Sequence, residues 1–220
     1  KLYNDHPRVE LGYTMRTVAD TNPTAYYVAF PFTGEQLEFD VPGGFVKPGE
    51  NQLEGTSSDW NTIQNFVSAR TDGYQILLSS KEVPLVQLGD MLDGPFEYIK
   101  HYDQAHVFSW VTNNYWFTNF RASQEGEMQW RYTITSRQDT KNTEALKFAL
   151  GDRVQAYARV LPIGTKDNQA MEGSLLEIND NDLMITSMAP AQKKGYLILQ
   201  VRETSGCEAK KLQLTSKRKI

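Results

Sequence analysis

Aromatic rings and asparagine side chains are concentrated in one short segment, from His106 to Phe120. An asparagine side chain offers a hydrogen-bond donor and an acceptor, and an aromatic ring offers an apolar face. Together they suit a polyhydroxylated ligand. The candidate carbohydrate-binding residues are therefore Asn113, Asn114, Trp116 and Asn119, with Trp60 and Arg131 as further members of a rim.

A structural interpretation of the same segment stays open, and we favour it. Alternate aromatic residues would fill the core of a β-sandwich, while Asn113, Asn114 and Asn119 would satisfy backbone groups in a bulge or turn. Asn113 and Asn114 are the expected place for a bend or bulge, because asparagine tolerates a positive φ.

Other residues that carry chemistry have weaker patterns. Retaining glycoside hydrolysis needs two carboxylates about 5–5.5 Å apart, and the candidate pairs are Asp90 with Asp93 and Glu125 with Glu127. We interpret both pairs as solvated loop charges. A trio of His101, Asp103 and His106 has metal-binding side chains, but its spacing matches no strong zinc signature. We expect His106 to be structural and expect no metal ligands in this chain.

Composition excludes several functional classes. The chain has 220 residues, 40% of them hydrophobic, and a net charge of −4. A net negative charge argues against a nucleic-acid partner, which requires a concentrated positive patch. No apolar run approaches the roughly 20 residues of a membrane-spanning helix, so we expect no membrane partner. The lone Cys207 cannot form an internal disulfide.

Apolar alternation at period two recurs along the chain and predicts strands. In residues 127–137, for example, Met128, Trp130, Tyr132 and Ile134 share one face. A helix is expected over residues 143–150, with Gly151 as its stop. Strands are expected at 9–15, 26–32, 36–41, 62–69, 74–79, 84–88, 105–112 and 127–137, and then at 175–178, 183–188, 196–202 and 211–214.

Strands dominate this pattern and do not alternate with helices, so the chain is expected to be all-β with sandwich architecture. Residues 162–173 contain the polar run Gly164–Gln169 and look like a linker. We place the domain boundary there, which divides the chain into residues 1–163 and 172–220.

The segment from His106 to Phe120, followed by Trp130-Arg131-Tyr132, resembles the C-terminal β region of glycoside hydrolase family 38, the α-mannosidase family. Shorter similarities occur in the same order along the chain: Ala29–Phe32, Asp40–Gly44, Asp59–Gln64, Pro84–Gly89 and Met184–Pro190. The resemblance therefore covers nearly the whole chain.

This resemblance implies a supersandwich like that of galactose-mutarotase-like domains in residues 1–163, followed by a small terminal β-sandwich in residues 172–220. It also implies a parent enzyme that hydrolyses α-mannosides with retention. In the family, two carboxylates and a bound zinc lie in an N-terminal catalytic domain. That domain is absent here, so no catalytic residue and no cofactor are assigned to this chain.

Three functional hypotheses follow. The first is a non-catalytic C-terminal region whose partner is the N-terminal catalytic domain of the same protein. This region would support that domain and shape its site for a mannoside-type carbohydrate. The alternative is a stand-alone carbohydrate-binding module. The third is a mutarotase-like enzyme, which requires a histidine and a carboxylate that converge on one concave sheet.

Overall fold

The computed structural model of this chain describes residues 1–56, 59–91, 102–115, 121–160, 173–206 and 211–216. The chain divides into two compact units. Unit 1 comprises residues 1–140 and 144–153, and unit 2 comprises residues 141–143 and 154–220. The predicted linker at 162–173 lies almost entirely outside the described residues, so the boundary proposed there stays a prediction.

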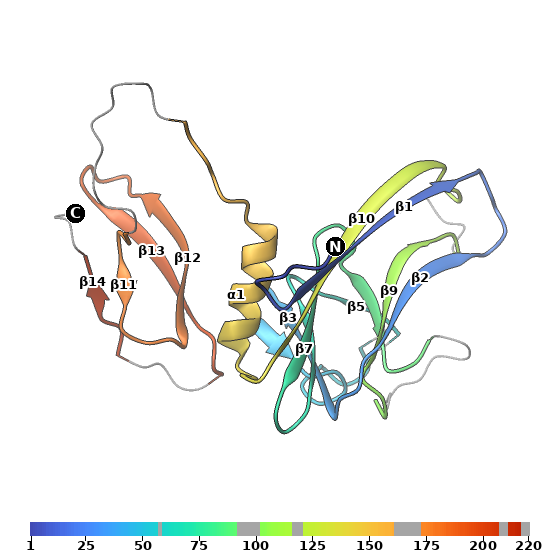
Figure 1. The fold of residues 1–220 in the computed structure, drawn as a ribbon, viewed down its shortest axis with the longest axis horizontal. Helices are drawn as coiled ribbons and strands as arrows, with labels where there is room; N and C mark the ends of the chain where they lie inside the picture. The colour runs from blue at the N-terminus through green and yellow to red at the C-terminus, as the bar shows by residue number, and fades with distance from the viewer. Residues whose placement is uncertain (57–58, 92–101, 116–120, 161–172, 207–210, 217–220) are drawn as a thin grey trace. The chain divides into compact units, whose positions relative to one another are not determined.

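Unit 1 contains two antiparallel sheets (Figure 1). The larger sheet has six strands in the order β1-β10-β7-β6-β3-β4. The bounds of these strands are β1 (Arg8–Thr17), β3 (Gln36–Val41), β4 (Gly44–Val46), β6 (Val67–Arg70), β7 (Gln75–Ser80) and β10 (Gly126–Arg137). The longest pairing joins β1 to β10 without interruption, from Arg8 opposite Thr135 to Thr17 opposite Gly126.

The smaller sheet has four strands in the order β2-β9-β8-β5. Their bounds are β2 (Ala25–Pro31), β5 (Asn61–Thr62), β8 (Leu85–Leu88) and β9 (His106–Asn113). Both sheets contribute alternate side chains to one apolar core, including Phe30, Val86 and Val107 from the smaller sheet and Phe39, Leu78 and Tyr132 from the larger. The sequence predicts correctly which residues of β10 share one face. The four residues that pack on this core are Met128, Trp130, Tyr132 and Ile134.

Tyr132 joins the two layers. Its ring packs edge-on against Phe30 with centroids 4.9 Å apart, and its hydroxyl donates a 2.8 Å hydrogen bond to Ser109 Oγ. Burial raises the pKa of Tyr132 to about 12, because a charged phenolate is poorly solvated inside the core.

The helix α1 (Asn142–Arg153) is hydrogen-bonded to Thr133, a side chain on the face of β10 that points away from the apolar core. Asp152 Oδ1 accepts hydrogen bonds from Thr133 at 2.8 Å and from Arg8 at 2.6 Å. Arg153 donates to the carbonyl of Ser80 at 3.1 Å. The predicted stop at Gly151 is therefore wrong: the helix continues past it, and the two residues that follow attach it to the sheet.

The described residues of unit 2 form two antiparallel strand pairs. One pair is β11 (Glu177–Ile178) with β14 (Leu214–Thr215), and the other is β12 (Leu183–Pro190) with β13 (Leu197–Glu203). The buried Thr204 has its hydroxyl 2.5 Å from that of Thr143 and donates to the carbonyl of Asp182 at 2.9 Å.

Two other local predictions are corrected. The strand expected over 62–69 is split into β5 and β6, and the asparagines Asn113 and Asn114 do not form the expected positive-φ bend, since no non-glycine residue described has a positive φ. Of the two expected alternatives, a bend or a bulge, the structure has a bulge, which lies just before the asparagines: Tyr26 pairs with Thr112 while Tyr27 pairs with Trp110. Val111 is the extra residue in β9.

The all-β prediction is confirmed. Strands dominate the described residues, all pairings among them are antiparallel, and the two sheets of unit 1 form a sandwich rather than a closed barrel. The narrower expectation of a galactose-mutarotase-like supersandwich with a terminal sandwich is compatible with this architecture.

Candidate functional site

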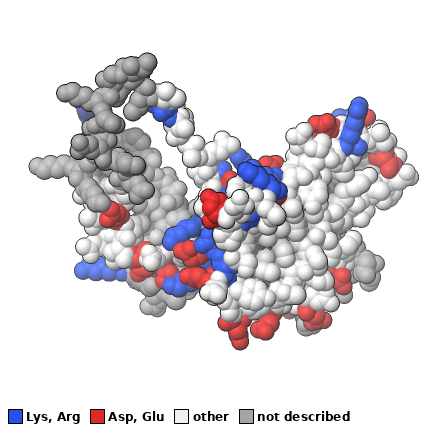
Figure 2. All heavy atoms as spheres, in the orientation of Figure 1, with Lys and Arg blue, Asp and Glu red and all other residues white. Residues whose placement is uncertain are grey.

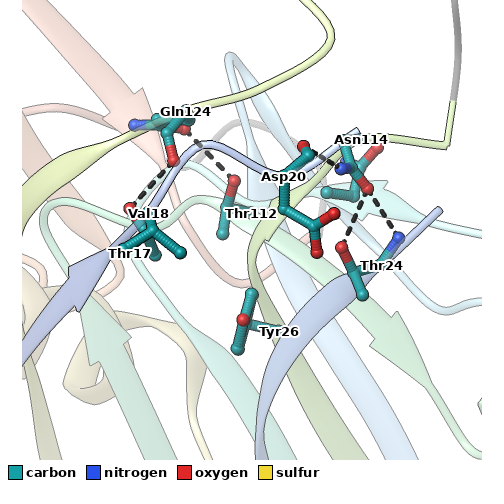
Figure 3. Close-up of a pocket in the computed structure, with 9 residues that line it drawn as sticks. Thr17, Val18, Asp20, Thr24, Tyr26, Thr112, Asn114 and Gln124 are labelled. Atoms are coloured by element: carbon teal, nitrogen blue, oxygen red, sulfur yellow. Dashed lines mark hydrogen bonds between the residues drawn. The ribbon is translucent and has the colours of Figure 1, made fainter. Parts of the chain in front are cut away.

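A shallow hollow in unit 1 lies where β1 leads into β2 and where β9 ends (Figure 3). It collects polar side chains from segments that are far apart in the sequence. Its volume is about 30 Å³, which is room for one or two water-sized groups. The lining residues are Thr17, Val18, Asp20, Thr24, Tyr26, Thr112, Asn113, Asn114 and Gln124.

Asn114 holds one wall of this hollow together. Its Oδ1 accepts hydrogen bonds from the Thr24 backbone N–H at 2.5 Å and from the Thr24 hydroxyl at 3.1 Å. Its Nδ2 donates to the Asp20 carbonyl at 2.9 Å (Figure 3). The backbone of Asn114 also donates to the Thr24 carbonyl at 3.0 Å. Asn114 therefore fixes the β1–β2 loop.

Gln124 forms the opposite wall. The Thr112 hydroxyl donates to Gln124 Oε1 at 3.1 Å, and the Thr17 hydroxyl donates to the Gln124 carbonyl at 2.8 Å (Figure 3). These bonds tie the segment before β10 to the ends of β1 and β9. The side-chain Nε2 of Gln124 has no hydrogen-bond partner within the described part of the chain.

Three more polar groups of the hollow can form further hydrogen bonds. Asp20 Oδ1 accepts from Asn22, whereas Asp20 Oδ2, Asn113 Nδ2 and the Tyr26 hydroxyl have no partner among the described residues. The hollow thus offers one carboxylate acceptor, two amide donors and a phenol. Such groups recognise neighbouring hydroxyls, because each hydroxyl both donates and accepts.

Tyr26 adds an apolar surface to these groups. It is the lining aromatic residue and is 47% exposed. A hollow of about 30 Å³ is too small to enclose a sugar ring, so a ring bound here would insert one or two hydroxyl groups and pack against the outside. The arrangement suits contact with one end of a carbohydrate.

Trp60 lies elsewhere, in an aromatic cluster around the buried Trp110. The rings of Tyr27, Trp60 and Tyr115 lie 5.4, 5.7 and 6.0 Å from that of Trp110, centroid to centroid. Burial, reinforced by Tyr115, raises the pKa of Tyr27. Trp60 is half-buried in this packing.

The other predicted site residues are not brought to the hollow. Arg131 lies on β10 opposite Gly12, and its backbone N–H donates to Glu82 at 3.2 Å. It does not line the hollow. Trp116 and Asn119 lie outside the described residues. Of the six predicted residues, the structure places Asn113 and Asn114 together.

The carboxylate pairs and the histidine–aspartate trio of the sequence analysis can be located only in part. Asp93 and His101 lie outside the described residues. Glu125 Oε1 lies 3.9 Å from Arg121 Nη2, and Glu127 Oε1 accepts a hydrogen bond from Gln129 at 2.8 Å. Both carboxylates are exposed. His106 packs edge-on against Phe108. Within the described ranges, no group of three or more His, Cys, Asp or Glu residues is arranged to hold a metal ion.

Surface charge is mixed where it can be seen. On the face shown in Figure 2, basic and acidic side chains of the described residues are interspersed. Among the described residues there is no helix that is long and apolar enough to span a membrane.

Sequence reasoning missed Asp20, Thr24, Tyr26 and Gln124. A local signal exists for the first of these, because Asp20-Thr-Asn-Pro-Thr24 is a turn sequence after an alternating strand. No local signal indicates that this turn meets the end of β9, since the β2–β9 pairing joins residues about eighty positions apart along the chain.

Comparison with protein-family models gives no match to this chain, and comparison with curated proteins gives none either.

Proposed function

We propose that this chain is the non-catalytic β region of an α-mannosidase-like glycoside hydrolase, and that its hollow contacts the carbohydrate. The observation that carries the proposal is the position of the asparagine–aromatic segment. The described part of this segment, from His106 to Tyr115, supplies the inner strand β9, and its Asn113 and Asn114 line a hollow with unpaired polar groups.

The chemistry of the hollow supports a carbohydrate over an apolar ligand. Asp20 Oδ2 would accept a hydrogen bond from a sugar hydroxyl, and the amides of Asn113 and Gln124 would donate to hydroxyl oxygens. The exposed ring of Tyr26 would pack against the C–H groups of the sugar. In this proposal the nucleophile, the acid/base and the zinc belong to the N-terminal catalytic domain, and this region buttresses that domain.

Calorimetric titration of the chain with mannose, mannobiose and mannan tests the carbohydrate contact. Saturable binding is expected, and both Asp20→Ala and Tyr26→Ala should weaken it at least tenfold. Asp72→Ala is the matched control, because Asp72 is an exposed loop residue outside the hollow. Absence of binding to all three sugars would contradict the contact.

An assay with an aryl α-mannoside tests the non-catalytic role. The chain alone should leave the substrate unchanged. Turnover that disappears when a single carboxylate is replaced would contradict this part of the proposal.

A stand-alone carbohydrate-binding module is the second candidate. It is favoured by the fact that every lining residue of the hollow comes from unit 1. The titration separates the two candidates. Full affinity in the isolated chain supports the module, whereas weak binding that strengthens when the catalytic domain is present supports the β region.

A further inference from the structure

The strand β1 forms one edge of the six-stranded sheet, and among the described residues its outer side is occupied at one end only. On its inner side β1 pairs with β10 over its whole length. On its outer side Leu2 forms an antiparallel bridge with Val9. Figure 1 marks the N-terminus beside this part of β1.

Lys1 and Glu10 exchange two backbone hydrogen bonds across this outer side. The Glu10 N–H donates to the Lys1 carbonyl at 2.9 Å, and the α-amino group of Lys1 donates to the Glu10 carbonyl at 2.6 Å. This is the geometry of a hydrogen-bonded pair in an antiparallel ladder. The edge of β1 therefore already accepts an antiparallel strand.

The backbone groups of a strand alternate between its two sides. Because Glu10 directs its N–H and C=O outward, Gly12, Thr14 and Arg16 do the same. None of these three residues has an outer backbone partner among the described residues. The register of β1 with β10 contains no bulge, and the sequence from Leu11 to Thr17 contains no proline. Natural sheets protect an exposed edge with such features.

We propose that the free edge of β1 from Leu11 to Thr17 pairs with an extended segment that runs antiparallel to it and continues the register of Lys1. This inference rests on the proposed function, under which the catalytic domain supplies the segment from the N-terminal side. In this register a residue placed before Lys1 would lie opposite Leu11, and each residue further from Lys1 would lie opposite the next residue of β1.

The side chains of β1 specify the chemistry of this segment. Leu11, Tyr13 and Met15 pack against the apolar core while remaining partly exposed. Residues opposite them would complete that layer and should be apolar. Residues opposite Gly12, Thr14 and Arg16 lie on the other face and should be polar. The occupant is therefore an alternating strand, and a carboxylate opposite Arg16 would add a cross-strand ion pair.

The test adds the seven residues Thr-Glu-Val-Thr-Val-Thr-Val directly before Lys1 of the full chain. This order places valine opposite Leu11, Tyr13 and Met15 and glutamate opposite Arg16. Hydrogen exchange at the Gly12, Thr14 and Arg16 amides should slow at least tenfold relative to the unextended chain. A control extension with proline opposite Gly12 and Thr14 should leave exchange unchanged, because proline at these positions prevents the ladder from forming: it cannot donate to the Gly12 and Thr14 carbonyls.

A second variant removes the contact from the β1 side. Thr14→Pro deletes an outward N–H and leaves the ladder with β10 intact, a position in which edge strands tolerate proline. In the extended chain it should abolish the protection at Gly12 and Arg16, whereas Thr14→Ala should retain it. Equal exchange with and without the extension, or protection that depends on protein concentration, would overturn the inference.

The sugar titration remains an independent result. Loss of sugar binding with edge protection intact would refute the proposed function, and the reverse outcome would refute the pairing at β1.

Discussion

Asn114 is the side chain that connects the candidate site to the fold. Its amide satisfies backbone groups on both sides of the β1–β2 loop, through Thr24 and Asp20. Asn114→Ala should lower the free energy of unfolding by about 1–3 kcal/mol, because it leaves these groups without partners. It should also speed hydrogen exchange at the Thr24 amide. Urea unfolding and exchange measurements check both effects.

Asn113 provides the matched control. Its side chain accepts a single long hydrogen bond, 3.5 Å from the Tyr115 N–H. Asn113→Ala should therefore change stability by less than about 0.5 kcal/mol while weakening any sugar binding. Equal destabilisation by the two variants would show that Asn114 is not the loop anchor.

Tyr132 makes stability depend on pH in the alkaline range. Its pKa is raised from 10.0 to about 12 in the folded chain, so the native state retains a proton that the unfolded chain loses earlier. The resulting stability is complete below pH 10 and is lost as the pH rises towards 12. Urea unfolding across this range should show the decline, and Tyr132→Phe should reduce its slope. An unchanged slope in the variant would contradict the assignment.

At the scale of elements, the break between β5 and β6 shows how one buried carboxylate changes a strand. Asp40 Oδ1 accepts from the N–H groups of Asn65 and Phe66 at 2.7 and 2.8 Å. Asp40 Oδ2 accepts from Asn65 Nδ2 at 2.5 Å. These bonds hold the backbone in a bend where local alternation predicts a continuous strand.

Asp40→Ala should destabilise unit 1 by about 3 kcal/mol or more, since it leaves several buried N–H groups without the carboxyl oxygens that accept from them. Asp72→Ala, an exposed aspartate between β6 and β7, should have an effect of less than about 0.5 kcal/mol. Thermal unfolding followed by circular dichroism compares them. A similar loss of stability in both variants would refute the role of Asp40.

Hydrophobic periodicity predicts a strand well when the strand is regular and the whole of one face packs on the core. The bounds 36–41 of β3 match the structure, and the alternation of β10 assigns its core face correctly. The short strand β4 is missed because it has three residues, too few to show an alternation, and begins directly after the turn at Gly43. The hollow depends on pairings between distant segments, which local patterns do not contain; its asparagines are visible in the sequence, but their partners are not.

At the scale of the whole molecule, the buried apolar residues are distributed unevenly. The buried hydrophobic side chains of the described residues all lie between Phe30 and Ala149. In unit 2, by contrast, Met188, Tyr196 and Ile198 are 47%, 55% and 55% exposed. Two-stranded sheets are marginal in water without further packing. The two units should therefore differ in their ability to fold alone.

Residues 1–153 should unfold cooperatively by themselves, because this segment contains both sheets, the apolar core and the helix anchored by Asp152. Residues 154–220 alone should give a nuclear magnetic resonance spectrum with poor amide dispersion. The spectrum of residues 1–153 should overlay that of the full chain for β1, β9 and β10, and Tyr132 should keep its protected environment. A cooperative transition in 154–220 together with an unfolded 1–153 would mean that the core of unit 1 depends on residues beyond α1.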